Sequence, residues 1–229
     1  MFSNVYLAVT QREMEEFLPK NVAYLSCHFS SSGKGLSNLP QRLPENSLLL
    51  LDDSMPVYGH EPALVAAQLC DLVEVFSPKA VLLDFQRGWN AETEEMARSI
   101  LGSVPCPVAV TEAYAKALSC PVFLSAPAAD VGIRKHLSPW LKQGVFLELA
   151  PCGVKIEMTK DGCKKAPFRA QTQLPLYDEK LRCHYDVEVL AHKAVFTLTR
   201  TGPDLAALAE EAYRLGALGT VGLYQELCR

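Results

Sequence analysis

The chain has 229 residues, of which 49% are hydrophobic and 21% charged, and its formal net charge is −4. This length and composition predict one globular domain with a sizeable core and exclude intrinsic disorder. The lysines and arginines form no basic run, and no apolar run approaches the roughly 20 residues that span a bilayer, so neither nucleic acid nor a membrane is expected as a partner.

The N-terminal segment has neither the basic start nor the apolar run of a secretory signal. With Met1 as the native start, a cytosolic location is expected. The eight cysteines stand singly in apolar segments, and the sequence contains no Cys-x2-Cys or His-x3-His pair. We therefore interpret the thiols as reduced and predict no metal site built from them. No cofactor is expected.

The first half of the chain alternates short apolar runs with segments of helical period, the pattern of βα units around a parallel sheet. Runs such as LLLLDD and AVLLDF are continuously apolar, as expected for strands covered on both faces. The predicted strands are Asn4–Val9, Val22–Cys27, Ser47–Leu51 and Ala80–Phe85, and the predicted helices are Glu61–Phe76 and Ala91–Leu101. The Ser-, Gly- and Pro-rich segment Ser30–Asn46 has no helical period, so one outer helix is expected to be missing there.

The second half continues this pattern but is interrupted. Its predicted strands are Pro107–Thr111, Pro121–Leu124, Val145–Leu149 and Thr220–Tyr224, and its predicted helices are Ile133–Leu141 and Pro203–Leu215. Between the seventh strand and the last helix, at about residues 150–200, the alternation in VKIEM, DVEVL and AVFTLT around a Lys-Asp-Gly turn predicts inserted antiparallel strands.

These elements predict an α/β fold: a small, partly degenerate (β/α)8 TIM-like barrel of residues 1–229, with the β-rich insertion inside that single domain. Periodicity alone does not show that a sheet closes, so a doubly wound open sheet remains the alternative.

Polar side chains follow the predicted strands, and in a barrel they converge on the C-terminal face. The candidate catalytic residues are Asp84, Glu112 and Glu148, and the candidate ligand-binding residues are Asp52, Asp53, Gln86, Arg87, Trp89, Tyr114, Tyr224 and Gln225. Carboxylates crowded at one rim repel one another unless a cation or Arg87 neutralises them, or unless raised pKa values keep some of them protonated. Such crowding is typical of a functional site. The alternative is that Asp residues here only cap helices or form turns.

The segment KAVLLDFQRGWN resembles the fourth strand of the family 18 glycoside hydrolases, the chitinase-like barrels, whose signature ends in D-x-E. The resemblance rests on Asp84-Phe85-Gln86 after an apolar run, with Trp89 close behind, and on the insertion and Tyr224 in the last strand. In that family the Glu of D-x-E is the general acid. Here Gln86 stands in its place, and an amide has no proton to give at useful pH.

Several functions stay open. The resemblance implies a barrel that binds a glycan or polyol through Asp84, Gln86, Trp89 and Tyr224, with altered or lost hydrolase activity. Alternatively, Asp84 with Glu112 or Glu148 forms a relocated pair of catalytic carboxylates. A third reading is a Mg²⁺-dependent lyase or hydrolase of a small metabolite that uses Asp52, Asp53 and Glu112. The sequence contains no G-x-S-x-G elbow and no G-x-G-x-x-G loop.

Overall fold

A computed structural model describes residues 4–168 and 174–228. In these residues, eight parallel strands hydrogen-bond in a closed ring, in the order β1-β14-β8-β7-β6-β5-β4-β2 and back to β1. The strands of the ring are β1 (Val5–Val9), β2 (Val22–Phe29), β4 (Leu48–Asp52), β5 (Ala80–Asp84), β6 (Val108–Thr111), β7 (Val122–Leu124), β8 (Val145–Leu149) and β14 (Gly219–Leu223). The predicted barrel is confirmed. The open sheet is wrong, because β1 also pairs with β2, with Leu7 opposite Val22.

The barrel strands are apolar on both faces because each face has its own core. In β4, Leu48 and Leu50 point into the barrel, while Leu49 packs in the outer core under the helices. The interior core consists of Ala8, Ala23, Leu48, Leu50, Ala80, Leu82, Ala109, Phe123, Phe146 and Val221. Burial on both sides explains why these strands read as continuous apolar runs rather than as an alternation.

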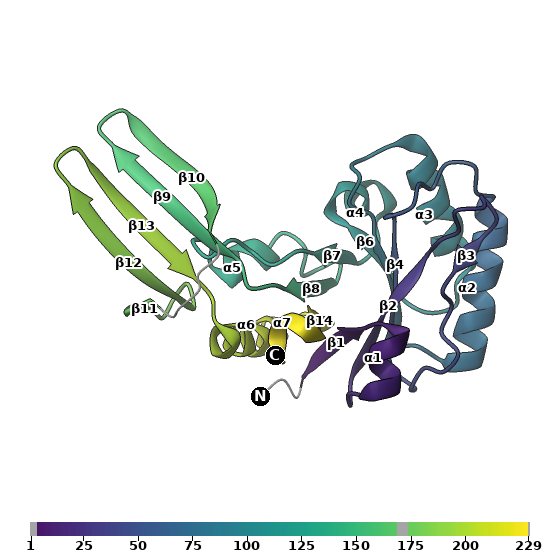
Figure 1. Cartoon of the computed structure of the whole chain (residues 1–229). Coiled ribbons are helices and arrows are strands. Elements are labelled where there is room, and N and C mark those ends of the chain that lie inside the picture. Colours follow the sequence, from purple (N-terminus) through teal and green to yellow (C-terminus); the bar gives the residue numbers. More distant parts are fainter. Residues whose placement is uncertain (1–3, 169–173, 229) are drawn as a thin grey trace.

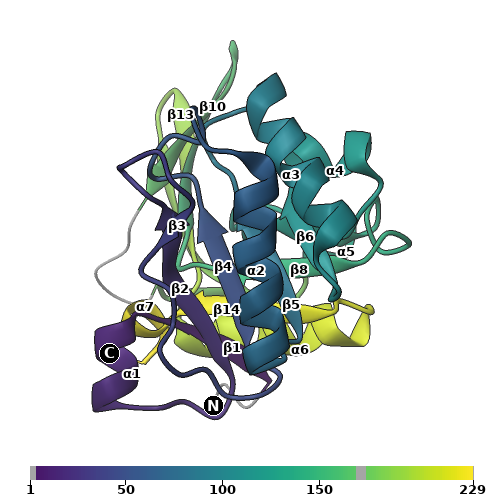
Figure 2. The same ribbon diagram turned by 90° about the vertical axis from the view of Figure 1, so that its right-hand side faces the viewer.

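Helices cover the outside of the ring, and α2 and α3 lie side by side on one flank (Figure 2). The helices are α1 (Gln11–Glu16), α2 (Pro62–Phe76), α3 (Ala91–Ser103), α4 (Glu112–Leu118), α5 (Ile133–Leu137), α6 (Gly202–Arg214) and α7 (Tyr224–Leu227). In the described chain, residues 30–46 contain no helix, as predicted, but the short strand β3 (Leu36–Ser37) returns antiparallel to β2.

The helix predicted over Ile133–Leu141 is too long, since α5 ends at Leu137. Pro139 lacks the backbone N–H that a continued helix would need, although Ser138 before it keeps helical dihedral angles. The short helices α1, α4 and α7 were not predicted. In the described residues, no helix has the length and apolar character needed to cross a membrane.

The insertion lies between β8 and α6, as predicted, and forms an antiparallel sheet of its own in the order β10-β9-β13-β12-β11. Its strands are β9 (Gly153–Thr159), β10 (Gly162–Phe168), β11 (Leu176–Asp178), β12 (Cys183–Leu190) and β13 (Lys193–Thr199). Two long hairpins, β9–β10 and β12–β13, project from the barrel (Figure 1). Gly162, at φ +144°, ends the turn of the first hairpin where the sequence placed it.

Candidate functional site

Three carboxylates occupy the last inward-facing position of their barrel strands. Side chains alternate along a strand, so the residues that follow the inward-facing Leu50, Leu82 and Phe146 on the same face are Asp52, Asp84 and Glu148. The register of β4 and β5 puts Asp52 directly opposite Asp84. The strand sequence itself therefore builds an acidic layer at the C-terminal mouth of the barrel.

The carboxylates Asp84 and Glu148 of the acidic layer are partly buried, and burial raises their pKa values. Burial raises the pKa of Asp84; a hydrogen bond from Gln86 opposes the rise, and the charges of Asp52 and Asp53 add to it. Burial also raises the pKa of Glu148, followed by the charge of Asp84. Asp84 and Glu148 are thus electrostatic neighbours, and each is held more easily in its protonated form than a free carboxyl.

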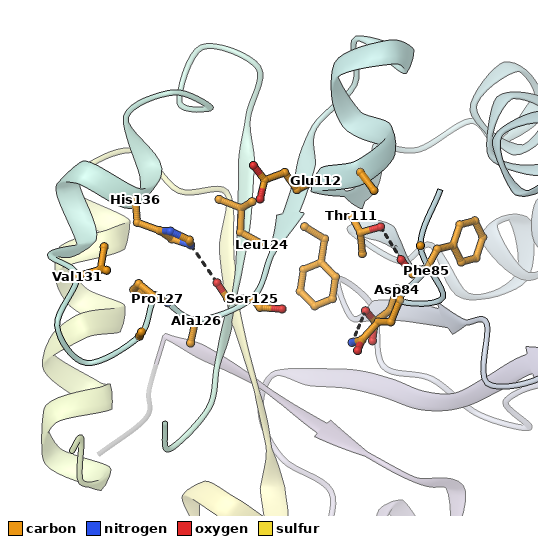
Figure 3. Close-up of a pocket in the computed structure, with 15 residues that line it drawn as sticks. Asp84, Phe85, Thr111, Glu112, Leu124, Ser125, Ala126, Pro127, Val131 and His136 are labelled. Atoms are coloured by element: carbon orange, nitrogen blue, oxygen red, sulfur yellow. Dashed lines mark hydrogen bonds between the residues drawn. The ribbon is translucent and has the colours of Figure 1, made fainter. Parts of the chain in front are cut away.

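A pocket of about 390 Å³ opens beside this layer, at the ends of β5, β6 and β7 (Figure 3). Its volume lies within the range of small-molecule sites, roughly 300–1,000 Å³. The polar side chains in its wall are those of Asp84, Gln86, Thr111, Glu112, Ser125 and His136. Its apolar wall comes mainly from Phe123, Leu124, Pro127 and Val131. Two of the candidate catalytic residues, Asp84 and Glu112, therefore line the same cavity.

In this pocket, Gln86 forms a side-chain hydrogen bond with Asp84. Its side-chain Nε2 donates to Oδ1 of Asp84 at 2.9 Å, the contact that is dashed in Figure 3. The amide thus fixes the orientation of the carboxylate while its own oxygen remains an acceptor. The pocket presents a donor and acceptors at one point, which suits a hydroxyl-bearing ligand.

Asp53 and Arg87 support the pocket from outside its wall. The buried carboxylate of Asp53 accepts from the backbone N–H groups of Gln86 at 2.9 Å and of Arg87 at 3.0 Å. The Arg87 side chain donates to the carbonyl of Ser54. These hydrogen bonds tie the loop after β4 to the loop after β5, so the geometry gives both residues a positioning role, and their predicted contact with a ligand stays a prediction.

Tyr114 and Trp89 also lie outside the pocket wall. Tyr114 is fully buried; its hydroxyl donates to the carbonyl of Gly88 at 2.7 Å and accepts from the N–H of Asn90 at 3.3 Å. It was predicted as a ligand contact, but its burial makes it a support of the loop after β5. Trp89 is 61% exposed, and its Nε1 donates to Glu94 at 2.8 Å.

Tyr224 was predicted to end the last strand, but β14 ends at Leu223, and Tyr224 lies on the β1–β14 side of the mouth. Tyr224 begins α7 and stacks on Phe17, with ring centroids 5.5 Å apart. The next residue, Gln225, donates to Oε1 of Glu13 at 2.8 Å. Tyr224 thus connects α7 to the residue that follows α1, and Gln225 connects α7 to α1 itself. Glu148 and Tyr224 were predicted to line one pocket with Asp84 and Glu112, but neither of them is part of that wall.

Sequence reasoning gave no role to His136, which the structure places in the pocket. Its Nε2 lies 3.0 Å from the carbonyl oxygen of Ser125 (Figure 3). His136 belongs to α5, several residues after the end of β7, and only the fold of the intervening loop brings it back to the mouth. Ser125, at the strand end, also forms a hydrogen bond with Glu148 that opposes, without cancelling, the rise in the pKa of this carboxyl caused by burial.

The Mg²⁺ reading required Asp52, Asp53 and Glu112 to act together. In residues 4–168 and 174–228, no group of three or more His, Cys, Asp or Glu side chains is arranged to hold a metal ion. Asp53 is hydrogen-bonded to backbone N–H groups instead. The geometry therefore gives this reading no support.

Comparisons with known proteins point to one fold. No family model matches the chain, and neither does any curated protein. Among solved structures, a family 18 N-acetylglucosaminidase from Paenibacillus barengoltzii is similar, with a TM-score of 0.57, 8% identity and coverage of 98% of both chains.

Two further solved structures are similar to the chain over most of its length. The chitinase-like agglutinin RobpsCRA from Robinia pseudoacacia has a TM-score of 0.51 at 10% identity, over 94% of this chain and 90% of that chain. A chitinase from Chromobacterium violaceum has a TM-score of 0.50 at 10% identity, over 96% of this chain and 93% of that chain. Since identities this low establish the fold alone, the chain is a divergent protein with the barrel fold of the family 18 glycoside hydrolases.

Proposed function

We propose that this glycoside-hydrolase-like barrel binds a glycan or a related polyol in the pocket at its C-terminal face, and that its hydrolase activity is altered or lost. The observation that carries the proposal is Gln86, which lines the pocket and donates to Asp84. The family that the sequence resembles has its general acid at this position. General acid catalysis contributes about 10²- to 10⁴-fold to rate, and a carboxamide contributes none of it.

The pocket wall supports binding of a sugar-like ligand. Carboxylates, an amide and hydroxyls stand beside the apolar surface of Phe123 and Pro127, and a sugar ring likewise has hydroxyls around an apolar face. That a chitinase-like agglutinin shares this fold is consistent with a binding role. The ligand class is thus a small molecule or an oligosaccharide rich in hydroxyls.

A second candidate function is hydrolysis by a relocated carboxylate pair. Asp84 and Glu148 both have raised pKa values, and the charge of Asp84 contributes to that of Glu148. Pairs of carboxyls whose environments differ are how glycosidases divide the acid and base roles. This candidate predicts slow sugar hydrolysis that is lost in both Asp84→Asn and Glu148→Gln.

A thermal-shift screen tests the proposal with three probe classes: N-acetylglucosamine oligosaccharides, sugar phosphates and Mg²⁺. A ligand at 100 times its Kd stabilises the folded form by about 2.7 kcal/mol. For a chain of this size this raises the Tm by roughly 5–10 °C. A shift with the oligosaccharides supports the proposal; a shift with Mg²⁺ alone would overturn it in favour of the metal reading.

The proposal includes a cytosolic site of action, the location expected from the sequence. Cell fractionation with an antibody against the chain checks it, and recovery of the protein from the medium or an extracellular layer would contradict it.

A further inference from the structure

One wall of the pocket has no regular secondary structure of its own. Residues 125–132, between β7 and α5, contain neither helix nor strand, and Ser125, Ala126, Pro127, Ala128 and Val131 of this segment line the cavity. We call this segment the β7–α5 loop. Without a ladder of backbone hydrogen bonds, its shape depends on contacts from elsewhere in the chain.

Arg200, the residue that follows β13 of the insertion, supplies such contacts. Its side chain is among the most buried of the described chain, at 2% exposure. The guanidinium donates through Nη1 to the carbonyl of Pro127 and through Nη2 to the carbonyl of Val131 at 3.1 Å. Both acceptors belong to the β7–α5 loop.

The same guanidinium is anchored on the other side by the insertion. Nη2 also donates to the carbonyl of Leu181 at 3.0 Å, and Nε donates to the carbonyl of Arg182 at 3.3 Å. The planar, rigid fork of arginine can reach carbonyls on two segments at once, which a lysine ammonium on a flexible stem does not reproduce. Arg200 therefore joins the pocket loop to the start of β12.

Further contacts from the insertion meet the same loop. Lys165 of β10 forms an ion pair with Asp130, and the thiol of Cys152 donates to the carbonyl of Pro127 at 3.3 Å. Ala129, fully buried, packs in a small apolar core with Val154, Cys183 and Leu198. The loop that lines the pocket on one side is thus fastened to the insertion on the other.

We propose that the insertion is the support of the pocket wall and that Arg200 is a positioning residue. By fixing Pro127 and Val131 it holds the loop that places Ser125 and His136 at the cavity. The structural part of this inference stands on the contacts above, and its consequence for ligand affinity rests on the proposed function.

The experiment compares Arg200→Lys with the wild-type chain by amide hydrogen exchange and by binding of the N-acetylglucosamine tetramer. We expect exchange in residues 125–132 to rise about tenfold or more, as loss of a hydrogen bond from a charged group produces, with β5 and β8 as protected as before. Tetramer binding is expected to weaken by about the same factor. A uniform rise in exchange over the whole barrel would mark Arg200 as a general stabiliser and overturn the inference.

A milder pair of variants covers the case in which Arg200→Lys does not fold. Lys165→Met removes the ion pair to the loop, and Lys193→Met, the control, removes the ion pair with Glu157 inside the insertion sheet. Exchange in the loop should rise in the first variant and not in the second, and equal exchange in both contradicts the inference. If the wild-type chain binds no tetramer, the proposed function fails, while the exchange data still decide the role of the insertion.

Discussion

Gln86 occupies the place where the family that the sequence resembles carries its acid, so introducing a carboxyl group there is the first test of a single residue. Gln86→Glu is expected not to restore strong hydrolysis of chitin-like oligosaccharides. The family that the sequence resembles has a longer signature with further aspartates before D-x-E; the matching positions here are Lys79 or apolar residues, so the new acid lacks its supporting charges. Product formation from N-acetylglucosamine oligomers is the measurement, and rapid turnover by the variant would refute the prediction.

The raised pKa of Asp84 has a consequence for stability. A carboxyl whose pKa is higher in the folded than in the unfolded chain binds more protons when folded, so its contribution to stability falls as pH rises above the unfolded value of about 4. Asp84→Asn removes this penalty. The variant should therefore melt at a higher temperature than the wild type at pH 7, and the gain should disappear near pH 4.

Melting curves of both proteins across this pH range check the sign of the effect. The exposed Asp71, on the outer helix α2, provides the control, since Asp71→Asn should give no comparable gain. A lower melting temperature of Asp84→Asn at pH 7 would mean that the carboxylate makes stabilising contacts that outweigh its burial.

Trp89 tests whether an exposed aromatic beside the pocket serves binding. Because its side chain is 61% exposed, Trp89→Ala should change stability by about 0.5 kcal/mol or less and the Tm by less than about 2 °C. Ligand binding should weaken. The other tryptophan, Trp140, is 5% exposed, and its replacement by alanine should cost about 3–5 kcal/mol. Equal losses of stability in the two variants would show that Trp89 belongs to the core.

At the scale of elements, α6 shows how the insertion and the barrel share one hydrogen-bond system. Oδ2 of Asp204 accepts from the N–H of Thr201 at 2.7 Å, from its hydroxyl at 2.8 Å, and lies 2.9 Å from Nδ1 of His184 in β12. The buried carboxylate thus caps the helix and contacts the insertion.

Asp204→Ala should cost about 2–4 kcal/mol of unfolding free energy, because it removes a cap and leaves buried donors without their acceptor. Asn90→Ala is the matched control, since Asn90 caps α3 with one bond to the N–H of Thr93 and should cost about 1 kcal/mol. Urea unfolding of both variants measures the difference. Equal costs would show that the bond to the insertion contributes nothing.

The helices that the sequence did not predict are short. Helix α1 begins with a capping box in which Thr10 and Glu13 bond each other's backbone, and the Thr-x-x-Glu spacing was a visible signal for it. The start of α4 at Glu112 places a predicted strand-end residue in the first turn of a helix. Local signals therefore predict the long buried strands well, and they fail where a helix of a few residues depends on tertiary support.

At the scale of the whole molecule, closure of the ring is the step that sequence periodicity does not contain. It depends on a pairing between β1 and β2 that only the assembled barrel makes. That Asp84 and Glu112 line one cavity follows from the convergence of strand ends in such a ring, while Glu148 lies outside the wall of that cavity and the catalytic role of all three stays a prediction. The position of His136 and the backbone bonds of Asp53 follow from loop conformations, which no local pattern encodes.

A calorimetric titration of the N-acetylglucosamine tetramer into the wild-type chain, Asp84→Ala and the control Asp71→Ala tests whether the barrel mouth binds a sugar. A sugar site at the barrel mouth predicts saturable binding to the wild type and to the control, weakened about tenfold or more in Asp84→Ala by loss of hydrogen bonds to a charged group. Equal affinity in Asp84→Ala and the wild type, or no binding heat in either, would contradict a sugar site at the barrel mouth.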